Sequence, residues 1–319
     1  MEYRQLGKAG IKLSEVSFGS WITFGSSLDL VGAKNLIRAA FDQGINFFDN
    51  AEAYAGGKAE VIMGEALRDF RREDLVISTK IFWGGKRPND RGLSFKHLVE
   101  GTKNSLKRFG MDYVDLLFCH RPDPDTPIEE TVRAMDIIIR SGMAFYWGTS
   151  EWSREDIEQA HHIAKSINAI PPSMEQPQYN LFHRERMELE YAPLFKKYGM
   201  GTTIWSPLAG GLLTGKYING VPKGSRFDQH PEFGRRLTDK GEDCFKGLNA
   251  IAMELGITLG QLAIAWCLKN EFVSSVILGA TSLGQLEENL QAVEAKKLLS
   301  DSVMDSIQML LGSTDDKVF

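Results

Sequence analysis

The sequence has few cysteines and no long apolar run, and each absence excludes a class of protein. Only three of its 319 residues are cysteine (Cys119, Cys244 and Cys267), and no cysteine or histidine pair has zinc-ligand spacing. We therefore expect neither a disulfide framework nor a metal site. No stretch of about 18 apolar residues is present, and the first residues carry no signal-peptide core. We expect no membrane insertion, and the cytoplasm is the expected compartment.

Neither sign of charge is in large excess. The 37 Lys and Arg residues nearly balance the 42 Asp and Glu residues, and the formal net charge is −5. This balance argues against nucleic acid or a membrane surface as a partner. The segment Phe18-Gly19-Ser20-Trp21 lacks the G-x-G-x-x-G fingerprint of a doubly wound dinucleotide-binding fold. No internal repeat or domain boundary is visible, so we expect one domain over residues 1–319.

Short apolar runs alternate with segments of helical periodicity along the whole chain. The eight runs are Val16–Trp21, Ile45–Asp49, Leu75–Lys80, Val114–His120, Ala144–Gly148, Ser173–Gln176, Gly201–Ser206 and Ser274–Ala280. Strands that alternate with helices are parallel, because each crossover needs a helix to return the chain. Eight such units predict an α/β fold, the (β/α)8 TIM barrel.

Two further segments complete the predicted fold. Tyr3–Leu6 and Gly10–Leu13 predict an N-terminal β-hairpin that plugs the bottom of the barrel. Pro207–Glu242 is rich in glycine, proline and charge, and predicts a long top-face loop before the last strand. Two helices, near residues 243–255 and 258–269, are expected to follow that loop.

Residues with capping preferences mark several helix ends. Thr126-Pro127-Ile128-Glu129 predicts a helix start with an N-cap, a proline at the first helical position and a capping-box acid. Gly44, Gly110, Gly142 and Gly199 each follow a helical segment, where a left-handed C-cap residue is expected.

Ionisable side chains collect at the carboxyl ends of consecutive runs. Asp49, Lys80 and His120 end three of them, and Tyr54 follows Asp49 by five residues. These strand ends form the active-site face of a TIM barrel. Each residue alone also has a structural interpretation, as a turn cap, an ion-pair partner, a rim histidine or a loop aromatic. Three consecutive strands that deliver Asp, Lys and His to one rim favour a catalytic group.

Together these residues predict a proton donor for carbonyl reduction. A free tyrosine has a pKa of about 10, too high for an efficient acid near neutrality. We expect the Lys80 ammonium to lower the pKa of Tyr54, while Asp49 keeps Lys80 charged and in place. His120 would donate a hydrogen bond to the carbonyl oxygen and polarise it. A barrel hydrolase would require paired carboxylates or a metal set, and Asp49 beside Lys80 offers neither.

Longer motifs around these positions carry a family resemblance. They are Phe47–Tyr54, Gly57–Glu60, Thr79–Lys86, Arg121–Pro124, Tyr146–Ser150, Trp205–Ala209 and Gln261–Leu268. With them the chain resembles the aldo-keto reductase superfamily, whose Asp, Tyr, Lys and His tetrad matches the four residues above. It is most similar to the branch that contains the voltage-gated potassium channel β subunits. Those subunits carry asparagine at the position of His120, so the histidine here favours a working reductase.

The resemblance implies NADPH/NADP+ as the cofactor, extended over the top of the barrel. The residues it places at the cofactor are Ser20, Trp21 and Asp49 (nicotinamide ribose), Ser150 and Gln176 (carboxamide), Trp205 (ring), Ser206, Pro207, Leu208, Ala209, Gly210, Lys216 and Arg226 (pyrophosphate), and Gly279, Thr281, Gln285, Glu288 and Asn289 (adenosine). Position 151, where relatives carry arginine or asparagine, is glutamate, and no cofactor contact is given to it.

Several of these positions also have structural interpretations. Ser282 with Gln285 fits a helix capping box, Trp205 fits a core position on an apolar strand, and Lys216 and Arg226 fit a solvated loop. An arginine that many relatives place near Gln285 is absent. The preference for NADPH over NADH therefore depends on Lys216, Arg226, Thr281 and Gln285.

The expected substrate is a small carbonyl compound. The resemblance implies a pocket lined by Trp21, Tyr54, Trp83 and His120, with Trp152 and Tyr179 as further candidates. Aromatic walls suit small aldehydes and aromatic or α-dicarbonyl compounds. The alternative function is a cofactor-binding regulatory subunit of the potassium-channel β type with slow or no turnover. Against it, the expected hairpin starts near the first residue and leaves no long segment to reach a pore. The branch resemblance also implies a homotetramer.

Overall fold

The computed structural model describes residues 1–217, 220–229, 231 and 239–313, and its centre is a closed parallel barrel. The strands are β3 (Val16–Gly19), β4 (Phe47–Asp49), β5 (Val76–Ile81), β6 (Val114–Cys119), β7 (Ala144–Thr149), β8 (Met174–Glu175), β9 (Gly201–Ile204) and β10 (Ser275–Leu278). Each pairs in parallel with the next, and β10 pairs with both β9 and β3, which closes the ring. Every strand overlaps its predicted apolar run, so the predicted (β/α)8 barrel is confirmed.

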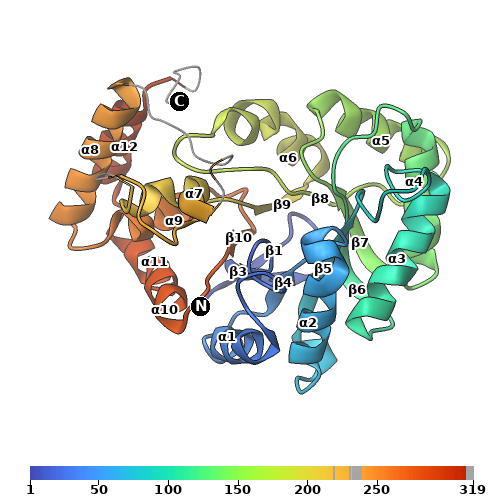
Figure 1. Ribbon diagram of the computed structural model, residues 1–319. Coiled ribbons are helices and arrows are strands. Elements are labelled where there is room, and N and C mark those ends of the chain that lie inside the picture. Colours follow the sequence, from blue (N-terminus) through green and yellow to red (C-terminus); the bar gives the residue numbers. More distant parts are fainter. Residues whose placement is uncertain (218–219, 230, 232–238, 314–319) are drawn as a thin grey trace.

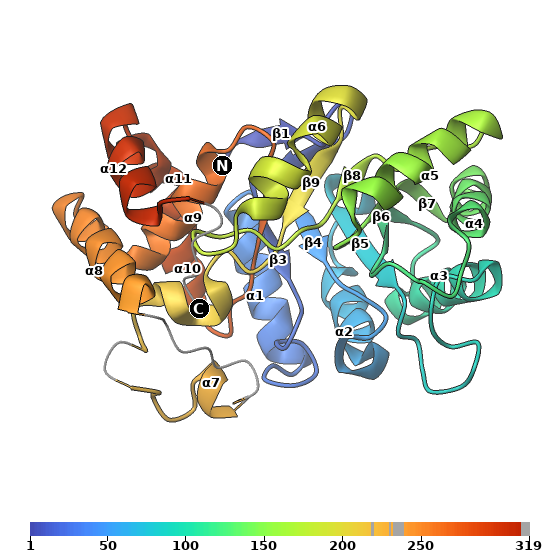
Figure 2. The ribbon, with the colours of Figure 1, turned by 90° about the horizontal axis from the view of Figure 1, so that it is seen from above.

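Helices form the outer layer of the molecule (Figure 1). They are α1 (Leu30–Asp42), α2 (Lys58–Leu67), α3 (Phe95–Phe109), α4 (Ile128–Arg140), α5 (Arg154–Ser166), α6 (Ala192–Tyr198), α7 (Arg226–Gln229), α8 (Asp239–Glu254), α9 (Leu259–Lys269), α10 (Leu283–Leu290), α11 (Ala292–Ala295) and α12 (Asp301–Leu311). Figures 1 and 2 show α1 to α6 following one another around the strands, with α8 to α12 gathered on the side where the barrel closes.

The N-terminal hairpin closes the bottom of the barrel, as predicted. Its strands β1 (Tyr3–Gln5) and β2 (Lys12–Ser14) pair antiparallel, and Leu6, directly after β1, and Leu13, on β2, are fully buried. These two leucines belong to a cluster inside the barrel. The strand residues of that inner cluster are Phe47, Val76, Leu116, Phe118, Met174 and Ile277. The lower barrel is therefore a packed apolar core and not a channel.

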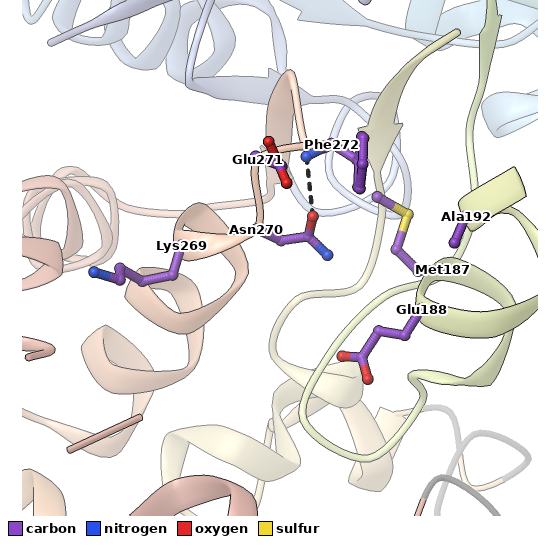
Figure 3. Close-up of a pocket in the computed structure, with 7 residues that line it drawn as sticks. All are labelled: Met187, Glu188, Ala192, Lys269, Asn270, Glu271 and Phe272. Atoms are coloured by element: carbon purple, nitrogen blue, oxygen red, sulfur yellow. Dashed lines mark hydrogen bonds between the residues drawn. The ribbon is translucent and has the colours of Figure 1, made fainter. Parts of the chain in front are cut away.

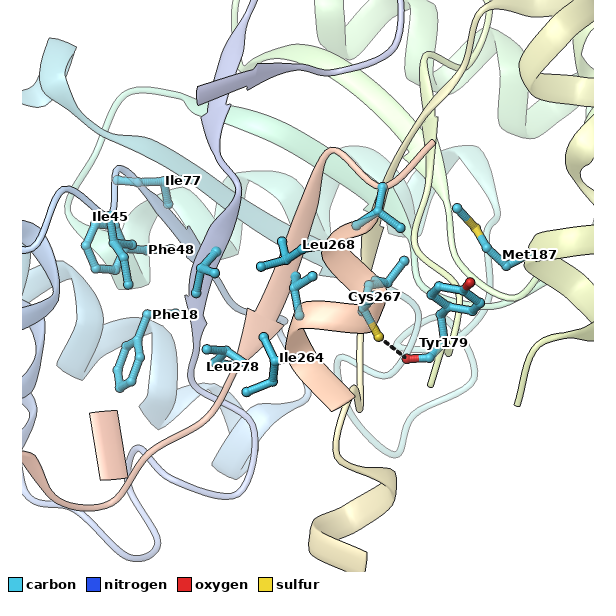
Figure 4. Packing of buried hydrophobic residues seen from close by; sticks show 14 of the residues in the cluster. Phe18, Ile45, Phe48, Ile77, Tyr179, Met187, Ile264, Cys267, Leu268 and Leu278 are labelled. Atoms are coloured by element: carbon cyan, nitrogen blue, oxygen red, sulfur yellow. Dashed lines mark hydrogen bonds between the residues drawn. The ribbon is translucent and has the colours of Figure 1, made fainter. Parts of the chain in front are cut away.

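A second and larger core lies between the strands and the helices. It includes Phe18 and Phe48 from the strands and Ile264 from α9, and Figure 4 shows part of it. The cysteines at 119, 244 and 267 are all buried, and none of them forms a disulfide with another.

The start of α4 differs from the prediction. The helix begins at Ile128 after Pro127, with no side-chain cap. The Thr126 hydroxyl donates instead to Asp123 Oδ2 (2.7 Å), so the predicted capping box does not form. Two of the predicted glycine C-caps are confirmed, because Gly110 and Gly199 follow α3 and α6 in the left-handed conformation.

The connection from β9 to β10 is long, as predicted, but part of it is helical. It contains a 3₁₀ turn, η4 (Ala209–Thr214), and the one-turn helix α7, and α8 begins at Asp239 rather than after Glu242. Residues 218–219, 230 and 232–238 of the predicted loop lie outside the described residues. Within the described ranges no single helix is long and apolar enough to cross a membrane. One pair of consecutive helices, Gly241–Glu254 and Leu259–Lys269, is together long and apolar enough by length and composition, but the two are bent by 92° relative to each other.

Gly148→Ala should destabilise the barrel severely. A Cβ at Gly148 on β7 would lie 2.2 Å from the Met174 carbonyl oxygen on β8. The two strands are paired at this point, so the backbone could not shift without disturbing that pairing. We expect the free energy of unfolding, measured by urea denaturation, to fall by about 3 kcal/mol or more. Gly284→Ala on the exposed surface of α10, where a Cβ meets no atom within 4 Å, is the matched control and should be neutral or slightly stabilising. Equal effects of the two substitutions would contradict the prediction.

Candidate active site

Strand alternation decides which side chains reach the mouth of the barrel. The inner cluster takes Phe47 from β4, Val76 from β5 and Phe118 from β6. Side chains an even number of residues further along a strand face the same way. This parity carries Asp49, Lys80 and His120 to the inner face at the carboxyl ends of three neighbouring strands. The three residues predicted from the ends of the apolar runs therefore meet above the inner cluster.

A buried ion pair between Asp49 and Lys80 is the centre of this group. Lys80 is fully buried and Asp49 is 3% exposed, with 2.5 Å between Nζ and Oδ2. Lys80 Nζ also donates to the Asn50 carbonyl (2.8 Å), and Asp49 Oδ1 accepts from Ser78 Oγ (2.7 Å) and Gln176 Nε2 (3.1 Å). Both charges are thus paired and hydrogen-bonded, as buried charges must be. Burial alone would lower the pKa of Lys80, but the Asp49 carboxylate reverses this and raises it.

Tyr54 joins the pair from the loop after β4. It opens a short turn, η1 (Tyr54–Gly57), in which Ala55 and Gly56 have φ of 50° and 61°. This left-handed bend leads directly into α2. The Tyr54 ring is half-buried, and its hydroxyl oxygen accepts a hydrogen bond from Lys80 Nζ (3.2 Å). Because the oxygen is the acceptor in that contact, the hydroxyl hydrogen remains for a ligand.

The pKa of Tyr54 differs from the expectation. Burial raises the pKa above the usual value of 10.0, the Lys80 ammonium lowers it, and the Asp49 carboxylate raises it. Lys80 therefore acts in the predicted direction, but its effect is smaller than that of burial, and the net shift is upward. The hydroxyl keeps its proton at neutral pH.

His120 completes the group next to an aromatic wall. It is 6% exposed, and its ring packs edge-on against Trp83 (4.9 Å between centroids) and Tyr54 (5.9 Å). Burial, followed by the positive charges of Lys80 and Arg121, lowers the pKa of His120 well below 6.5, so the imidazole is neutral. Its Nδ1 is buried without a protein partner. Such an atom is expected where a ligand or water supplies the hydrogen bond.

Three polar residues predicted at the nicotinamide lie beside the ion pair. The Ser20 hydroxyl donates to the Asp49 carbonyl (3.1 Å), and the Ser150 hydroxyl donates to the Gln176 carbonyl (2.9 Å). Gln176 Nε2 donates to Asp49 and to Thr203 Oγ1, both at 3.1 Å. Their hydrogens are thus engaged within the protein. These side chains can offer a ligand their oxygen atoms as acceptors.

Two indole rings stand at the same mouth. Trp21, after β3, is 39% exposed, and Trp205, after β9, is half-buried. The rings meet edge to face, with 6.4 Å between centroids and 82° between planes. Trp205 is therefore not a fully buried core residue, and a flat apolar ligand could cover its exposed part.

The segment predicted at the pyrophosphate forms a tight turn after Trp205. The Ser206 carbonyl accepts from Asn180 Nδ2 (3.0 Å) and the Ser206 hydroxyl accepts from the Gly210 amide (3.2 Å), so Pro207, Leu208 and Ala209 are held between fixed ends. Further along, Lys216 Nζ lies 5.1 Å from the Tyr217 ring centroid.

The same tyrosine connects this loop to α7. The Tyr217 and Phe227 rings stack with 4.2 Å between centroids, and the Phe227 amide donates to the Tyr217 hydroxyl (3.3 Å). Arg226 is the first residue of α7, and its side chain lies outside the described part of the structure. The stack therefore places the backbone of Arg226 close to the segment that carries Lys216.

The residues predicted at the adenosine surround the start of α10. Gly279, Thr281, Gln285 and Glu288 are exposed and Asn289 is half-buried. The Ser282 hydroxyl accepts from the Gln285 amide (3.3 Å) and caps the helix, in line with the structural alternative. Gln285 Oε1 accepts from the Thr281 amide (2.9 Å) and hydroxyl (3.0 Å) instead of closing a capping box.

Comparison with known proteins decides the family. The Aldo/keto reductase family profile matches residues 15–311. This chain belongs to the aldo/keto reductase family. A protein of Arabidopsis thaliana named "Probable voltage-gated potassium channel subunit beta" is 54% identical over 319 residues, covering 98% of this chain and 97% of the relative. A protein of the same name from Oryza sativa subsp. japonica is 53% identical with the same coverage. Both the family and the channel-subunit branch predicted from the motifs are confirmed.

Membership in the aldo/keto reductase family indicates an oxidoreductase, and the family generally uses NAD(P)H. The two further pocket candidates do not lie at the mouth. Trp152 and Tyr179 are each 2% exposed and belong to the outer core, where Tyr179 packs against Trp266. Aromatic content alone did not separate a mouth position from a core position.

Other residues of this aldo/keto reductase site were not named from the sequence. Ser78 binds Asp49, and its place two residues before Lys80 on one strand face was a usable signal. Arg121 Nη1 donates to Ser150 Oγ (3.1 Å), and its guanidinium lies 5.6 Å from the Trp83 ring centroid. The position of Arg121 next to His120 was the available signal for a cation at this rim.

A cavity of 330 Å³ lies apart from this group (Figure 3). It is lined by Met187, Glu188, Ala192, Lys269, Asn270, Glu271 and Phe272. Its polar groups are largely paired, since Glu188 accepts from the Tyr179 hydroxyl (2.8 Å) and Asn270 Oδ1 accepts from the Phe272 amide (3.0 Å). Elsewhere, no group of three or more His, Cys, Asp or Glu side chains is arranged for a metal ion in the described part of the chain.

Another buried carboxyl, Glu175, lies on β8 behind the mouth. Met174 faces the inner cluster, so Glu175 faces the helix layer, and it is fully buried. Glu175 Oε1 accepts from the Glu151 amide (2.5 Å), and Oε2 accepts from the Thr149 hydroxyl. Burial raises the pKa of Glu175 to about 8, the Thr149 hydrogen bond opposes the rise, and the Glu151 carboxylate adds to it.

Glu175→Gln should make the free energy of unfolding less dependent on pH. Between pH 4.5 and about 8 the folded protein holds a proton on Glu175 that the unfolded chain has released. The stabilisation from this proton is complete below pH 4.5 and is lost as the pH rises through about 8, by roughly 1.4 kcal/mol per pH unit between these values. Urea unfolding at several pH values across this range should show the free energy of unfolding falling more steeply with pH in the native chain than in the variant.

The exposed Glu129→Gln is the control for that series, because its side chain is 54% exposed. It should leave the slope unchanged. A stability difference between native chain and Glu175→Gln that stays constant with pH would contradict the raised pKa.

Proposed function

We propose that this protein reduces aldehydes or ketones to alcohols with NADPH, and that Tyr54 is the general acid. The observation that carries the proposal is the contact of the Tyr54 hydroxyl oxygen with Lys80 Nζ (3.2 Å), within the buried Lys80–Asp49 pair and beside His120. Because the Tyr54 oxygen accepts from the Lys80 ammonium, the Tyr54 hydroxyl hydrogen remains available for donation to a substrate. The ammonium is already in place to stabilise the phenolate that remains.

Each residue then has one role in the proposed reaction. Asp49 holds Lys80 charged and fixed, and Lys80 stabilises the developing phenolate of Tyr54. The Tyr54 proton goes to the carbonyl oxygen of the substrate. The neutral His120 imidazole donates a hydrogen bond to the same oxygen and polarises the carbonyl. When bound, NADPH supplies the hydride that the carbonyl carbon receives.

The residues at the mouth fit this cofactor. Ser150 and Gln176 can offer acceptor oxygens to a carboxamide, and Trp205 has an exposed part for a flat ring. Lys216, on the segment next to Arg226, supplies positive charge for phosphate. We propose that Ser20, Trp21, the turn from Ser206 to Gly210 and the residues around the start of α10 complete the cofactor site.

The proposed substrates are small carbonyl compounds with an aromatic or α-dicarbonyl character. Trp83 packs against His120, and Trp21 stands across the mouth against Trp205. Together with Tyr54 they give a pocket with aromatic walls and polar groups at one point, an arrangement typical of small-molecule sites.

Tyr54→Phe should abolish most of the activity without loss of cofactor binding. The substitution keeps the ring and removes only the hydroxyl, and Lys80 retains Asp49 and the Asn50 carbonyl. We expect kcat/KM for 4-nitrobenzaldehyde and methylglyoxal to fall by about 10² to 10⁴, measured by NADPH absorbance. Binding of NADPH, measured by its fluorescence, should stay within about twofold, since the hydroxyl is placed for proton transfer and not for holding the cofactor. Unchanged turnover in the variant would refute the role of Tyr54.

Lys216→Gln should weaken NADPH binding more than NADH binding. Lys216 would attract the pyrophosphate that both cofactors share and also the added negative charge of the 2′-phosphate, so its loss should raise the Kd for NADPH by about three- to tenfold and the Kd for NADH less. Fluorescence titration at low and high salt measures both, and the difference should shrink at high salt. Lys103→Gln on the exposed face of α3 is the matched control. A change of equal size for the two cofactors would show that Lys216 does not contribute to the preference.

The second candidate function is that of a channel-associated regulatory subunit. It is favoured by the names of the two plant relatives, which are 54% and 53% identical over nearly the whole chain. NADPH binding by the native chain with no reduction of any carbonyl tested would favour this candidate. A homotetramer and a cytoplasmic location remain predictions, the first from the branch resemblance and the second from the cysteine content.

A further inference from the structure

We propose that Glu151 is the positioning residue that fixes the Trp205 ring for the nicotinamide, by accepting a hydrogen bond from its indole N–H. The inference rests on the proposed function. Trp205 Nε1 donates to Glu151 Oε1 over 3.0 Å, although the two residues follow different strands, β7 and β9. An indole N–H at a partly exposed position could donate to water. Here the Trp205 N–H donates instead to the Glu151 carboxylate, which fixes the direction of the N–H bond.

The same carboxylate oxygen also holds the backbone beside Trp205. Glu151 Oε1 accepts from the Gln178 amide (2.6 Å), and Gln178 forms a parallel bridge with Trp205. The backbone of Trp205 is further fixed by hydrogen bonds to the Pro177 carbonyl (3.0 Å) and from the Tyr179 amide (3.2 Å). One oxygen therefore joins the ring of Trp205 to the segment on which its backbone rests.

Glu151 is itself held in an unusual conformation. Its φ is +60°, a left-handed value that is strained for a residue with a side chain. Its amide donates to the buried Glu175 (2.5 Å), which fixes the backbone in that conformation. The strain is therefore maintained by a buried partner. The result is that the carboxylate turns toward Trp205 and Gln178.

An ordinary ion pair does not account for this arrangement. Glu151 Oε2 lies 3.4 Å from Arg186 Nη1, but Arg186 also reaches Glu190 (3.6 Å), the Tyr191 hydroxyl (2.9 Å) and the Trp152 carbonyl (3.3 Å). Arg186 is thus satisfied without Glu151. The closer contacts of Glu151 are those with the indole and with the Gln178 amide.

The ring is restrained from a second side. The Trp21 ring meets it edge to face with 6.4 Å between centroids. Rotation of the Trp205 side chain would break the Glu151 contact and change the contact with Trp21. A ring held in this way presents the same face before and after a ligand binds, which reduces the ordering cost of binding.

The first test needs neither cofactor nor turnover. In ¹⁵N-indole-labelled protein, the Trp205 N–H signal is identified by its loss in Trp205→Phe. Glu151→Ala should move that signal upfield and speed its exchange with solvent, while Glu151→Gln, which keeps an acceptor oxygen, should restore slow exchange. Glu190→Ala is the matched control, because it removes the other carboxylate of Arg186 and should leave the signal in place. An indole signal that Glu151→Ala does not change would overturn the proposal.

The second test measures what the fixed ring contributes. Glu151→Ala should raise the Kd for NADPH by about tenfold, with Glu151→Gln recovering most of the loss. In the Trp205→Phe background, which keeps a ring but has no N–H, Glu151→Ala should add less than about twofold. If the fold-changes in the Kd for NADPH of the two single variants multiply in the double variant, the two residues act independently and the proposal is overturned. If native protein binds no NADPH, the proposed function fails while the indole test still decides the role of Glu151.

Discussion

The alternation of side chains along parallel strands is the constraint on which both the barrel and its mouth depend. The register that sends Phe47 and Val76 into the lower barrel also sends Asp49 and Lys80 inward above them. A slip of one residue would turn the apolar set toward the helices and separate the two charges. Core packing and charge pairing are therefore specified together. Neither could change register without the loss of the other.

Burial acts on three neighbouring groups in different ways, and only one of them has a counter-ion. It raises the pKa of Tyr54, lowers that of His120, and would lower that of Lys80 if Asp49 were not beside it. The outcome is a neutral phenol and a neutral imidazole next to a retained ammonium. The Asp49 carboxylate thus decides the direction of the Lys80 shift, whereas burial decides the directions for Tyr54 and His120.

Local pattern was sufficient for the fold and for bringing Asp49, Lys80 and His120 to one rim, and insufficient for the energetics of that group. Apolar runs located the eight strands, and the residues that end them located Asp49, Lys80 and His120. The partner of Glu151 was not predictable, because it depends on a left-handed backbone and on a tryptophan from another strand. The direction of the Tyr54 shift was missed because burial is a property of the assembled mouth. The capping box at Thr126 failed because Asp123 competes for the same hydroxyl.

The alternation that turns His120 inward also turns its neighbour Cys119 outward, into the layer between strands and helices. There burial raises the pKa of the Cys119 thiol far above its ordinary value, and that of Cys267 likewise. The thiolate is the form of cysteine that oxidants and electrophilic aldehydes attack. A reactive carbonyl compound that entered the barrel mouth would therefore meet a phenol, an imidazole and indoles, while the Cys119 sulfur one residue from His120 would stay protonated and shielded from alkylation.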